Sequence, residues 1–162
     1  MTLTELKKAI EQVKTRENMK DILYENYIQM KRLSNKQAKL VELLNLGINY
    51  YNTEQFDFAY STFTKAIDFE ADADAFHNRG TTCMDLNNLI QAIHDFTAAI
   101  IFCPTYASPY LNRGLCILQL LSDNGALNNY EYEDIKMFAK FDFQKAYQLG
   151  LQEANQYIKI VS

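Results

Sequence analysis

The 162-residue sequence predicts an all-α fold, a right-handed solenoid of paired helices, on three observations. Apolar residues recur at the three- and four-residue spacing of one helical face over most of the chain. Only five glycines and two prolines are present, too few for the many turns of an all-β protein. Gly47, Gly80 and Gly114 are 33 and 34 residues apart, which indicates an internal repeat.

The three repeat glycines lie inside patterns that are otherwise helical. Glycine in a helix interior costs about 0.5–1 kcal/mol relative to alanine, so three such losses at one period need a structural reason. We expect that a second helix approaches each glycine too closely for a side chain. An alanine–phenylalanine–alanine series at i, i+4 and i+7 follows each glycine and belongs to that second helix: Ala59, Phe63, Ala66; Ala92, Phe96, Ala99; and Ala139, Phe143, Ala146.

This pattern resembles the tetratricopeptide repeat, a helix–turn–helix unit of about 34 residues with the signature W-x2-L-G-x2-Y, A-x3-F, A and P. The resemblance covers residues 40–151 and implies a solenoid of three helix pairs. The sequence departs from the signature because it has no tryptophan, and because Arg79 and Arg113 precede two of the glycines. The matching residues are Leu43, Leu46, Gly47, Tyr50, Ala59, Phe63 and Ala66; Phe76, Gly80, Ala92, Phe96, Ala99 and Pro104; and Tyr110, Gly114, Ala139, Phe143 and Ala146.

Helix signals divide the chain into three parts. Residues 1–36 are expected to form an N-terminal amphipathic helical arm, residues 37–151 the three repeats, and residues 152–162 a C-terminal capping helix. The turn signal Ser-Asp-Asn-Gly opens an insertion near 122–131 in the third repeat, which we expect to be a surface loop. The expected helices of the repeats and the cap are 38–52, 55–69, 73–86, 89–102, 107–121, 132–149 and 152–161.

The expected arm is basic, whereas the rest of the chain is acidic. Residues 1–40 hold nine Lys and Arg and five Asp and Glu, a net charge of +4, and residues 41–162 carry −8. A basic amphipathic helix beside an acidic body has three explanations: it caps the first repeat, mediates self-association, or binds a partner or a surface. All three remain open from the sequence.

Asparagine stands two residues before each repeat glycine, at Asn45, Asn78 and Asn112. Stacked helix pairs line their concave side with the first helix of each pair, so the three asparagines are expected to form a row in an inner groove. An amide offers an acceptor and two donors, so such a row can hold the backbone of an extended peptide whatever its sequence. The alternative role is stabilisation of the helix pair itself.

The other positions expected in the groove are mostly apolar. They lie three residues before and one and four residues after each repeat glycine. Apolar residues that are exposed together on a concave face indicate a binding site. These positions hold Leu44, Ile48 and Tyr51; His77, Thr81 and Met84; and Leu111, Leu115 and Leu118.

Some tetratricopeptide-repeat domains hold the acidic C-terminus of a chaperone with a clamp of lysine, asparagine and arginine side chains. The resemblance places the clamp residues at five positions of this sequence. Only one of the five has the required residue type, Asn78, so this mode of recognition is disfavoured. The five positions are Leu44, Ile48, Asn78, Ser108 and Asn112.

Two further pairs of residues recur one repeat apart. Arg79 and Arg113 follow two of the asparagines, and we expect each to form a surface ion pair with an acidic residue of an adjacent helix. Cys83 and Cys116 lie beside the expected helix crossings, where a small buried side chain suits the packing.

The sequence argues against catalysis and against several classes of ligand. His77 and His94 are the only histidines, and their spacing gives no acid–histidine–nucleophile arrangement. No phosphate-binding glycine loop and no metal-type cysteine spacing is present, so we expect no enzyme activity, no cofactor and no metal. The net charge of −4 disfavours nucleic acid, and no apolar run is long enough to span a membrane. Three cysteines are typical of a reducing cytoplasm.

We therefore expect a cytoplasmic interaction module that binds a peptide segment of a partner protein in its groove. A second hypothesis is a chaperone of secreted or aggregation-prone client proteins, because an arm followed by three repeats resembles the layout of bacterial secretion chaperones. A third is a homo-oligomeric scaffold, such as a homodimer, that is joined through the N-terminal arm.

Overall fold

The structure is a computed structural model that describes the backbone of residues 3–123 and 129–162 and the side chains of residues 23–123 and 130–162. Every regular element in these ranges is a helix, which confirms the predicted all-α class. The helices are α1 (Leu3–Asn52), α2 (Phe56–Phe69), α3 (Ala73–Asp85), α4 (Leu89–Phe102), α5 (Ala107–Asp123), α6 (Asn129–Gln148) and α7 (Ala154–Ile160).

The chain divides into two compact units, residues 1–41 and 42–162, and each is described by itself. The first unit is a stretch of α1 whose described side chains are exposed up to Lys39, apart from half-buried Ile28. α1 is continuous through residue 37, where the sequence predicts the arm to end and the repeats to begin. The predicted domain limits themselves stay predictions.

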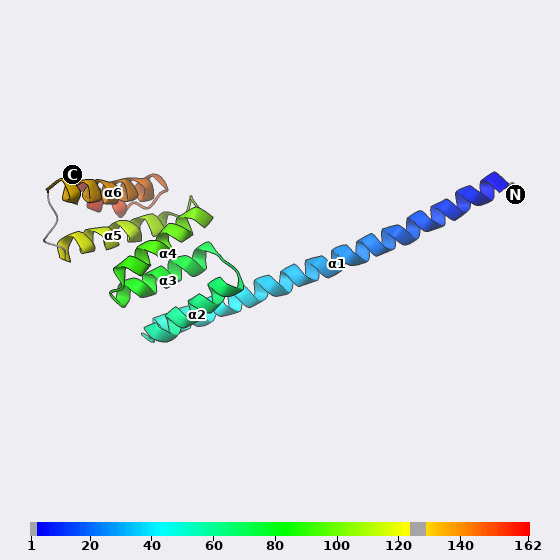
Figure 1. Ribbon diagram of the computed structural model, residues 1–162, viewed down its shortest axis with the longest axis horizontal. Helices are drawn as coiled ribbons and strands as arrows, with labels where there is room; N and C mark the ends of the chain where they lie inside the picture. Colours follow the sequence, from blue (N-terminus) through cyan, green and yellow to red (C-terminus); the bar gives the residue numbers. More distant parts are fainter. Residues whose placement is uncertain (1–2, 124–128) are drawn as a thin grey trace. The chain divides into compact units, whose positions relative to one another are not determined.

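In the second unit, the helices pack in the order in which they follow one another along the chain. α2 contacts α3, and the contacts continue in sequence from α3 through α7; Figure 1 shows α2 to α6 side by side. Residues 42–52 of α1 pair with α2, and the rings of Tyr50 and Phe58 stack with 5.5 Å between their centroids. Contacts between consecutive helix pairs make a solenoid, as the sequence predicts.

The three repeat glycines lie where two helices of a pair cross, which confirms the reason given for their spacing. A Cβ atom at Gly47 would lie 2.5 Å from the ring of Phe63. The same atom would lie 2.9 Å from the Phe96 ring at Gly80, and 2.6 Å from the Phe143 ring at Gly114. Real Cβ atoms do not approach other carbons this closely, so each glycine makes room for one phenylalanine ring.

The phenylalanines that fill this space form the centre of each helix pair. Phe63, Phe96 and Phe143 are buried, and so are the alanines four residues before and three residues after each of them. Small alanines let the second helix approach its partner, while the aromatic ring fills the gap beside the glycine. The periodic Ala, Phe and Ala residues therefore define the core, as the sequence predicts.

The helices of the third pair are longer than those of the second, because part of the predicted insertion is helical. α5 has 17 residues and α6 has 20, whereas α3 has 13 and α4 has 14. Residues 122–123 extend α5, and residues 129–131 belong to α6, so the prediction of a loop over all of 122–131 is wrong at both ends. The part of the insertion at 124–128 lies outside the described residues.

The last helix packs against α6. The rings of Phe143 and Tyr157 stack with 5.3 Å between their centroids, and Ala154 and Val161 are buried. Gly150 has a φ of 101°, a left-handed conformation that suits glycine and turns the chain from α6 towards α7. Within the described part of the chain, α7 therefore covers apolar surface that the third helix pair would otherwise expose.

Candidate functional site

We call residues 42–162 the repeat unit. The first helices of its three helix pairs form the candidate binding face. We call the side chains of residues 42–52 of α1, of α3 and of α5 the first-helix face. The hydroxyl of Tyr51 donates a hydrogen bond of 2.6 Å to Oδ2 of Asp85, which links α1 to α3. Nε2 of Gln119 in α5 donates to Oδ1 of Asn87, at 3.1 Å, just after α3. Side-chain bonds therefore connect neighbouring parts of this face.

The three asparagines of the predicted row are accessible. Asn45 is exposed, and Asn78 and Asn112 are half-buried. Among the described residues, no hydrogen bond uses the side-chain amide of any of the three. Each amide therefore keeps an acceptor and two donors that another molecule can use.

The apolar positions of the face differ in how much surface they offer. Ile48 is 38% exposed, whereas Leu111 is only 6% exposed and belongs to the core around α5 and α6. Leu111 therefore packs inside the third pair and has little surface left for a ligand. The intermediate positions are half-buried, and they are Leu44, Tyr51, His77, Thr81, Met84, Leu115 and Leu118.

Two side chains of the face have altered acidity. Burial raises the pKa of the Tyr51 hydroxyl to about 12, and the Asp85 carboxylate that accepts its hydrogen bond adds to the rise. Burial lowers the pKa of His77 from 6.5 to about 4, although Asp74 opposes the change. His77 is therefore neutral at physiological pH, and Tyr51 keeps its proton.

His77 is also the residue of the face whose unpaired polar atom is buried. Its Nδ1 is buried without a hydrogen-bond partner in the described part of the chain. The imidazole ring contacts Tyr106, with 4.9 Å between ring centroids, and Phe96, with 5.7 Å. The aromatic surroundings explain why the ring stays uncharged.

A hollow of about 510 Å³ lies beside this histidine. Tyr106, which contacts the His77 ring, forms part of its wall. The hollow is open and combines aromatic surface with two carboxylates. Asp72 caps the start of α3, and Asp74 adds to the rise that burial causes in the pKa of the Tyr106 hydroxyl. Its lining residues are Ala71, Asp72, Ala73, Asp74, Phe102, Cys103 and Tyr106.

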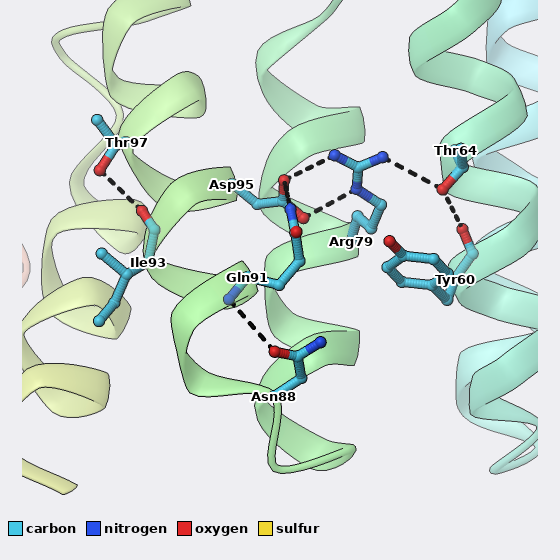
Figure 2. Close-up of polar contacts among 8 residues, drawn as sticks. All are labelled: Tyr60, Thr64, Arg79, Asn88, Gln91, Ile93, Asp95 and Thr97. Atoms are coloured by element: carbon cyan, nitrogen blue, oxygen red, sulfur yellow. Dashed lines mark hydrogen bonds and ion pairs between the residues drawn. The ribbon is translucent and has the colours of Figure 1, made fainter. Parts of the chain in front are cut away.

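Arg79, which follows Asn78 in the sequence, is fully engaged inside the fold (Figure 2). Its Nε and Nη2 donate to the two carboxylate oxygens of Asp95 in α4, at 2.8 and 2.7 Å. Its Nη1 donates to the hydroxyl of Thr64 in α2, at 3.2 Å. That hydroxyl donates in turn to the carbonyl oxygen of Tyr60, whose ring lies under the guanidinium.

Arg113 makes the equivalent contacts in the third helix pair. Its Nε and Nη2 donate to Asp142 in α6, both at 2.8 Å, and its Nη1 donates to the Thr97 hydroxyl in α4, at 3.0 Å. The side chain of Asp142 is completely buried. Burial raises the pKa of that carboxyl group, and the bonds from Arg113 oppose the rise.

The expectation of surface ion pairs for the two arginines is therefore wrong in one respect. The partners are acidic residues of adjacent helices, as predicted, but the pairs are buried. Side-chain exposure is 13% for Arg79 and 3% for Asp95. It is lower still for Arg113 and Asp142. Sequence reasoning missed Asp95 and Asp142, although each directly precedes the core phenylalanine of its repeat, a signal that identifies both.

The first-helix face consequently carries no available cation. Arg79 and Arg113 are the only basic residues in 42–52, α3 and α5, and both are bound to carboxylates. The positions at which a carboxylate clamp needs basic side chains hold Leu44, Ser108 and Asn112 instead. The face can bind apolar and hydrogen-bonding groups, but it offers nothing to neutralise an acidic ligand.

The cysteines and the remaining site types add no chemistry to this face. Cys83 and Cys116 are fully buried, and burial raises their thiol pKa values to about 11 and about 12, so neither is a thiolate at neutral pH. No cluster of potential metal ligands occurs among the described residues. None of the described helices combines the length and apolar character needed to cross a membrane.

Two known proteins are similar in sequence to much of this chain. No known protein-family profile matches the chain. It is 27% identical over 112 residues to a DnaJ homolog subfamily C member 7 homolog of Dictyostelium discoideum, covering 66% of this chain and 20% of that protein. It is 28% identical over 124 residues to human DnaJ homolog subfamily C member 7, covering 71% and 25%. The chain thus spans a quarter or less of these relatives.

Solved structures resemble the chain over most of its length. The first TPR of Spaghetti (RPAP3) bound to HSP90 peptide SRMEEVD has a TM-score of 0.65, with 21% identity, and covers 76% of this chain and 90% of that one. PcrH in complex with the chaperone binding region of PopD has a TM-score of 0.66, with 19% identity, and covers 77% and 92%. The Arabidopsis OM64 TPR domain also has a TM-score of 0.66, with 23% identity, and covers 78% and 96%.

These similarities agree with the internal evidence. The chain has three helix pairs at a period of 33 and 34 residues, and a glycine–phenylalanine contact lies inside each pair. The predicted tetratricopeptide architecture is therefore confirmed, and this chain has the tetratricopeptide-repeat fold.

Proposed function

We propose that this chain is a protein-interaction module that binds an extended segment of a partner protein on its first-helix face. One observation carries the proposal: the amides of Asn45, Asn78 and Asn112 recur on equivalent positions and have no partner within the described residues. Polar groups placed at one period suit the regular spacing of a peptide backbone. The neighbouring half-buried apolar residues provide contacts for side chains of the bound segment.

The charges of the first-helix face indicate which class of peptide segment it would bind. The face has no available cation, and it carries the carboxylates of Asp74 and Asp85. An acidic segment would lose its hydration without gaining an ion pair, which is unfavourable. We therefore propose that the bound segment is apolar and neutral or basic.

Two solved structures of similar fold bind different kinds of ligand. The Spaghetti (RPAP3) domain binds the acidic peptide SRMEEVD, whereas PcrH binds a region of PopD. The clamp positions of this chain lack the basic residues that an acidic C-terminus requires, so the first kind of ligand fits poorly. The absence of these basic residues also favours the second hypothesis from the sequence, a chaperone of an apolar client, as a specific form of the same binding.

The proposal contains no catalytic step. His77 is held neutral among aromatic rings, and His94 is exposed on α4. The partner peptide is therefore bound and released without chemical change, in a reducing compartment that suits three free cysteines.

Peptide binding to the whole chain tests the proposal. The probes are a capped peptide pool in which apolar residues alternate with serine and threonine, and the peptide SRMEEVD. Fluorescence anisotropy should show saturable binding of the capped pool and much weaker binding of SRMEEVD. Tighter binding of SRMEEVD, or no binding of the pool, would contradict the proposal.

Asparagine variants locate the binding. Asn78→Ala removes hydrogen bonds to the ligand, so we expect the dissociation constant of the capped pool to rise about tenfold, with an unchanged melting temperature. Gln144→Ala is the matched control, because Gln144 is exposed on α6, outside the first-helix face. An equal loss of binding and stability in Asn78→Ala would show that the amide supports the helix pair instead.

A further inference from the structure

The first unit of the chain carries an apolar helix face that nothing in this unit covers. Leu23 is 64% exposed, Tyr27 is 58% exposed and Met30 is 70% exposed. Their spacing of four and three residues places them on one side of α1. The same side continues to Val41, and a hollow of about 490 Å³ lies along it, lined by Met30, Leu33, Ser34, Gln37, Ala38 and Val41. We call Leu23, Tyr27, Met30, Leu33 and Val41 the arm face.

A helix with such a face is expected to pack against another helix. Isolated helices are only marginally stable in water, and helices in proteins gain most of their stability from packing an amphipathic face. The small side chains of Ser34 and Ala38 lie between larger ones along the hollow, which leaves space for side chains of a second helix.

The repeat unit has its own exposed apolar face, on α6. Met137 is 64% exposed, Phe138 is 50% exposed and Phe141 is 56% exposed, and all three lie within about one turn of the same helix. The exposed apolar residues of α2 and α4 are more widely spaced along their helices or lie at helix ends. We call Met137, Phe138 and Phe141 the α6 face.

Net charge favours a contact between the arm and the repeat unit over a contact between two arms. The basic arm of residues 1–40 has a net charge of +4, and the remaining residues, 41–162, have a net charge of −8. Two arms repel each other, whereas the arm of one copy attracts the repeat unit of another. Every copy carries both surfaces, so the exchange of two arms closes a symmetric dimer.

We propose that the arm face docks on the α6 face of a second copy, and that two such contacts form a dimer. The contact joins two amphipathic helices through apolar side chains, with opposite net charges on the two partners. It leaves the first-helix face available, so it is independent of the proposed peptide binding.

Sedimentation equilibrium of the full chain tests the dimer. Wild type should be a dimer, and Met30→Gln and Phe141→Gln should each raise its dissociation constant at least about tenfold. Glutamine forms helices about as well as methionine, so circular dichroism should show unchanged helix content. Ile101→Gln is the matched control, because Ile101 is 72% exposed on α4 and belongs to neither face, and this variant should dimerise as wild type does.

Salt separates this dimer from an arm-to-arm coiled coil. Opposite charges are screened by salt, so the proposed dimer should weaken between about 50 mM and about 500 mM NaCl. A pair of basic arms would instead gain stability with salt and would respond to Met30→Gln but not to Phe141→Gln. A monomeric wild type, or a dimer that is unaffected by Phe141→Gln, would overturn the proposal.

Discussion

The first helix pair of the repeat unit lacks the buried ion pair that the second and third pairs share. Arg79 and Arg113 bind carboxylates of α4 and α6, whereas Leu46 occupies the equivalent position in the first pair. Thr62 stands where the other pairs have an aspartate. Leu46 is 42% exposed, so the first pair leaves at its surface the position that the others bury.

The difference shows what the arginine does. Each guanidinium bonds an aspartate in its own pair and a threonine in the preceding pair, so it joins three consecutive helices. α1 is continuous from Leu3 to Asn52, so no second helix of an earlier pair supplies a threonine to the first pair. An arginine at residue 46 would find neither partner, which explains an apolar residue there.

The largest expected effect comes from removing one partner of the third pair. Arg113→Met leaves the Asp142 carboxyl group fully buried without its ion-pair partner, so we expect a loss of about 3–5 kcal/mol in the free energy of unfolding. Urea denaturation monitored by circular dichroism measures this loss.

Two further variants show whether the loss comes from the buried charge. Arg113→Met combined with Asp142→Leu removes both charges and should recover most of the stability. Leu46→Ala, at the same position of the first pair, should cost far less because that side chain is partly exposed. Equal losses in Arg113→Met and in the double variant would contradict the assignment.

A feature that all three pairs share should respond next. Gly80→Ala places a Cβ atom 2.9 Å from the Phe96 ring, and we expect this overpacking to cost about 1–3 kcal/mol despite the better helix propensity of alanine. Differential scanning calorimetry measures the change. Phe96→Leu shortens the neighbouring side chain, so Gly80→Ala should cost less in that background, and additive losses would argue against the contact.

The second pair differs from the others in having a histidine where they have leucine. His77 has a pKa of about 4 in the folded chain and 6.5 when unfolded, so only the unfolded state gains a proton between these values. Stability should therefore fall as the pH drops from about 6.5 to about 4, by on the order of 2 kcal/mol. His77→Leu should lose this part of the pH dependence in urea titrations.

Met84→Leu, on the same helix as His77, is the control for this titration. This variant should keep the pH dependence of wild type, because it removes no titratable group. If His77→Leu retained the full dependence, other titrating groups would have to account for it.

The smallest expected effect concerns the bond between pairs. Thr97→Val removes the hydroxyl that accepts from Arg113, so we expect a loss of about 1 kcal/mol in thermal denaturation. Thr81→Val is the matched control, since the Thr81 hydroxyl only donates to the carbonyl of His77 in its own helix. Equal losses in the two variants would show that the bond between pairs contributes nothing measurable.

Sequence reasoning predicted the packing of this fold well, because size and period are local properties. A missing side chain at Gly80 and a ring at Phe96 can be paired from spacing alone, and the structure confirms the contact. The buried position of Asp95 could not be predicted from the general rule that charges face water. The loop prediction was wrong at residues 122–123 because Ser122 and Asp123 are also compatible with the end of a helix.

The candidate site was only partly predictable. A helical period places Asn78 on the first-helix face, but it does not say whether the amide already has a partner. Leu111 shares its position with Leu44 and His77, and yet it is almost fully buried. Exposure of such positions depends on the neighbouring pair, which a single repeat does not specify.

The lack of a buried arginine–aspartate ion pair among the described residues of the first helix pair affects the dynamics of the fold. Solenoids open locally where the coupling between neighbouring elements is weakest. Residues 42–52 are held to α2 by the contacts of Gly47 and Tyr50 with phenylalanine rings, without any buried ion pair. Amide hydrogens in this segment should exchange with deuterium sooner than those of α3 and α5. The part of the first-helix face at residues 42–52 can then open locally while α3 and α5 stay folded, and a long segment of the proposed kind would enter the face there.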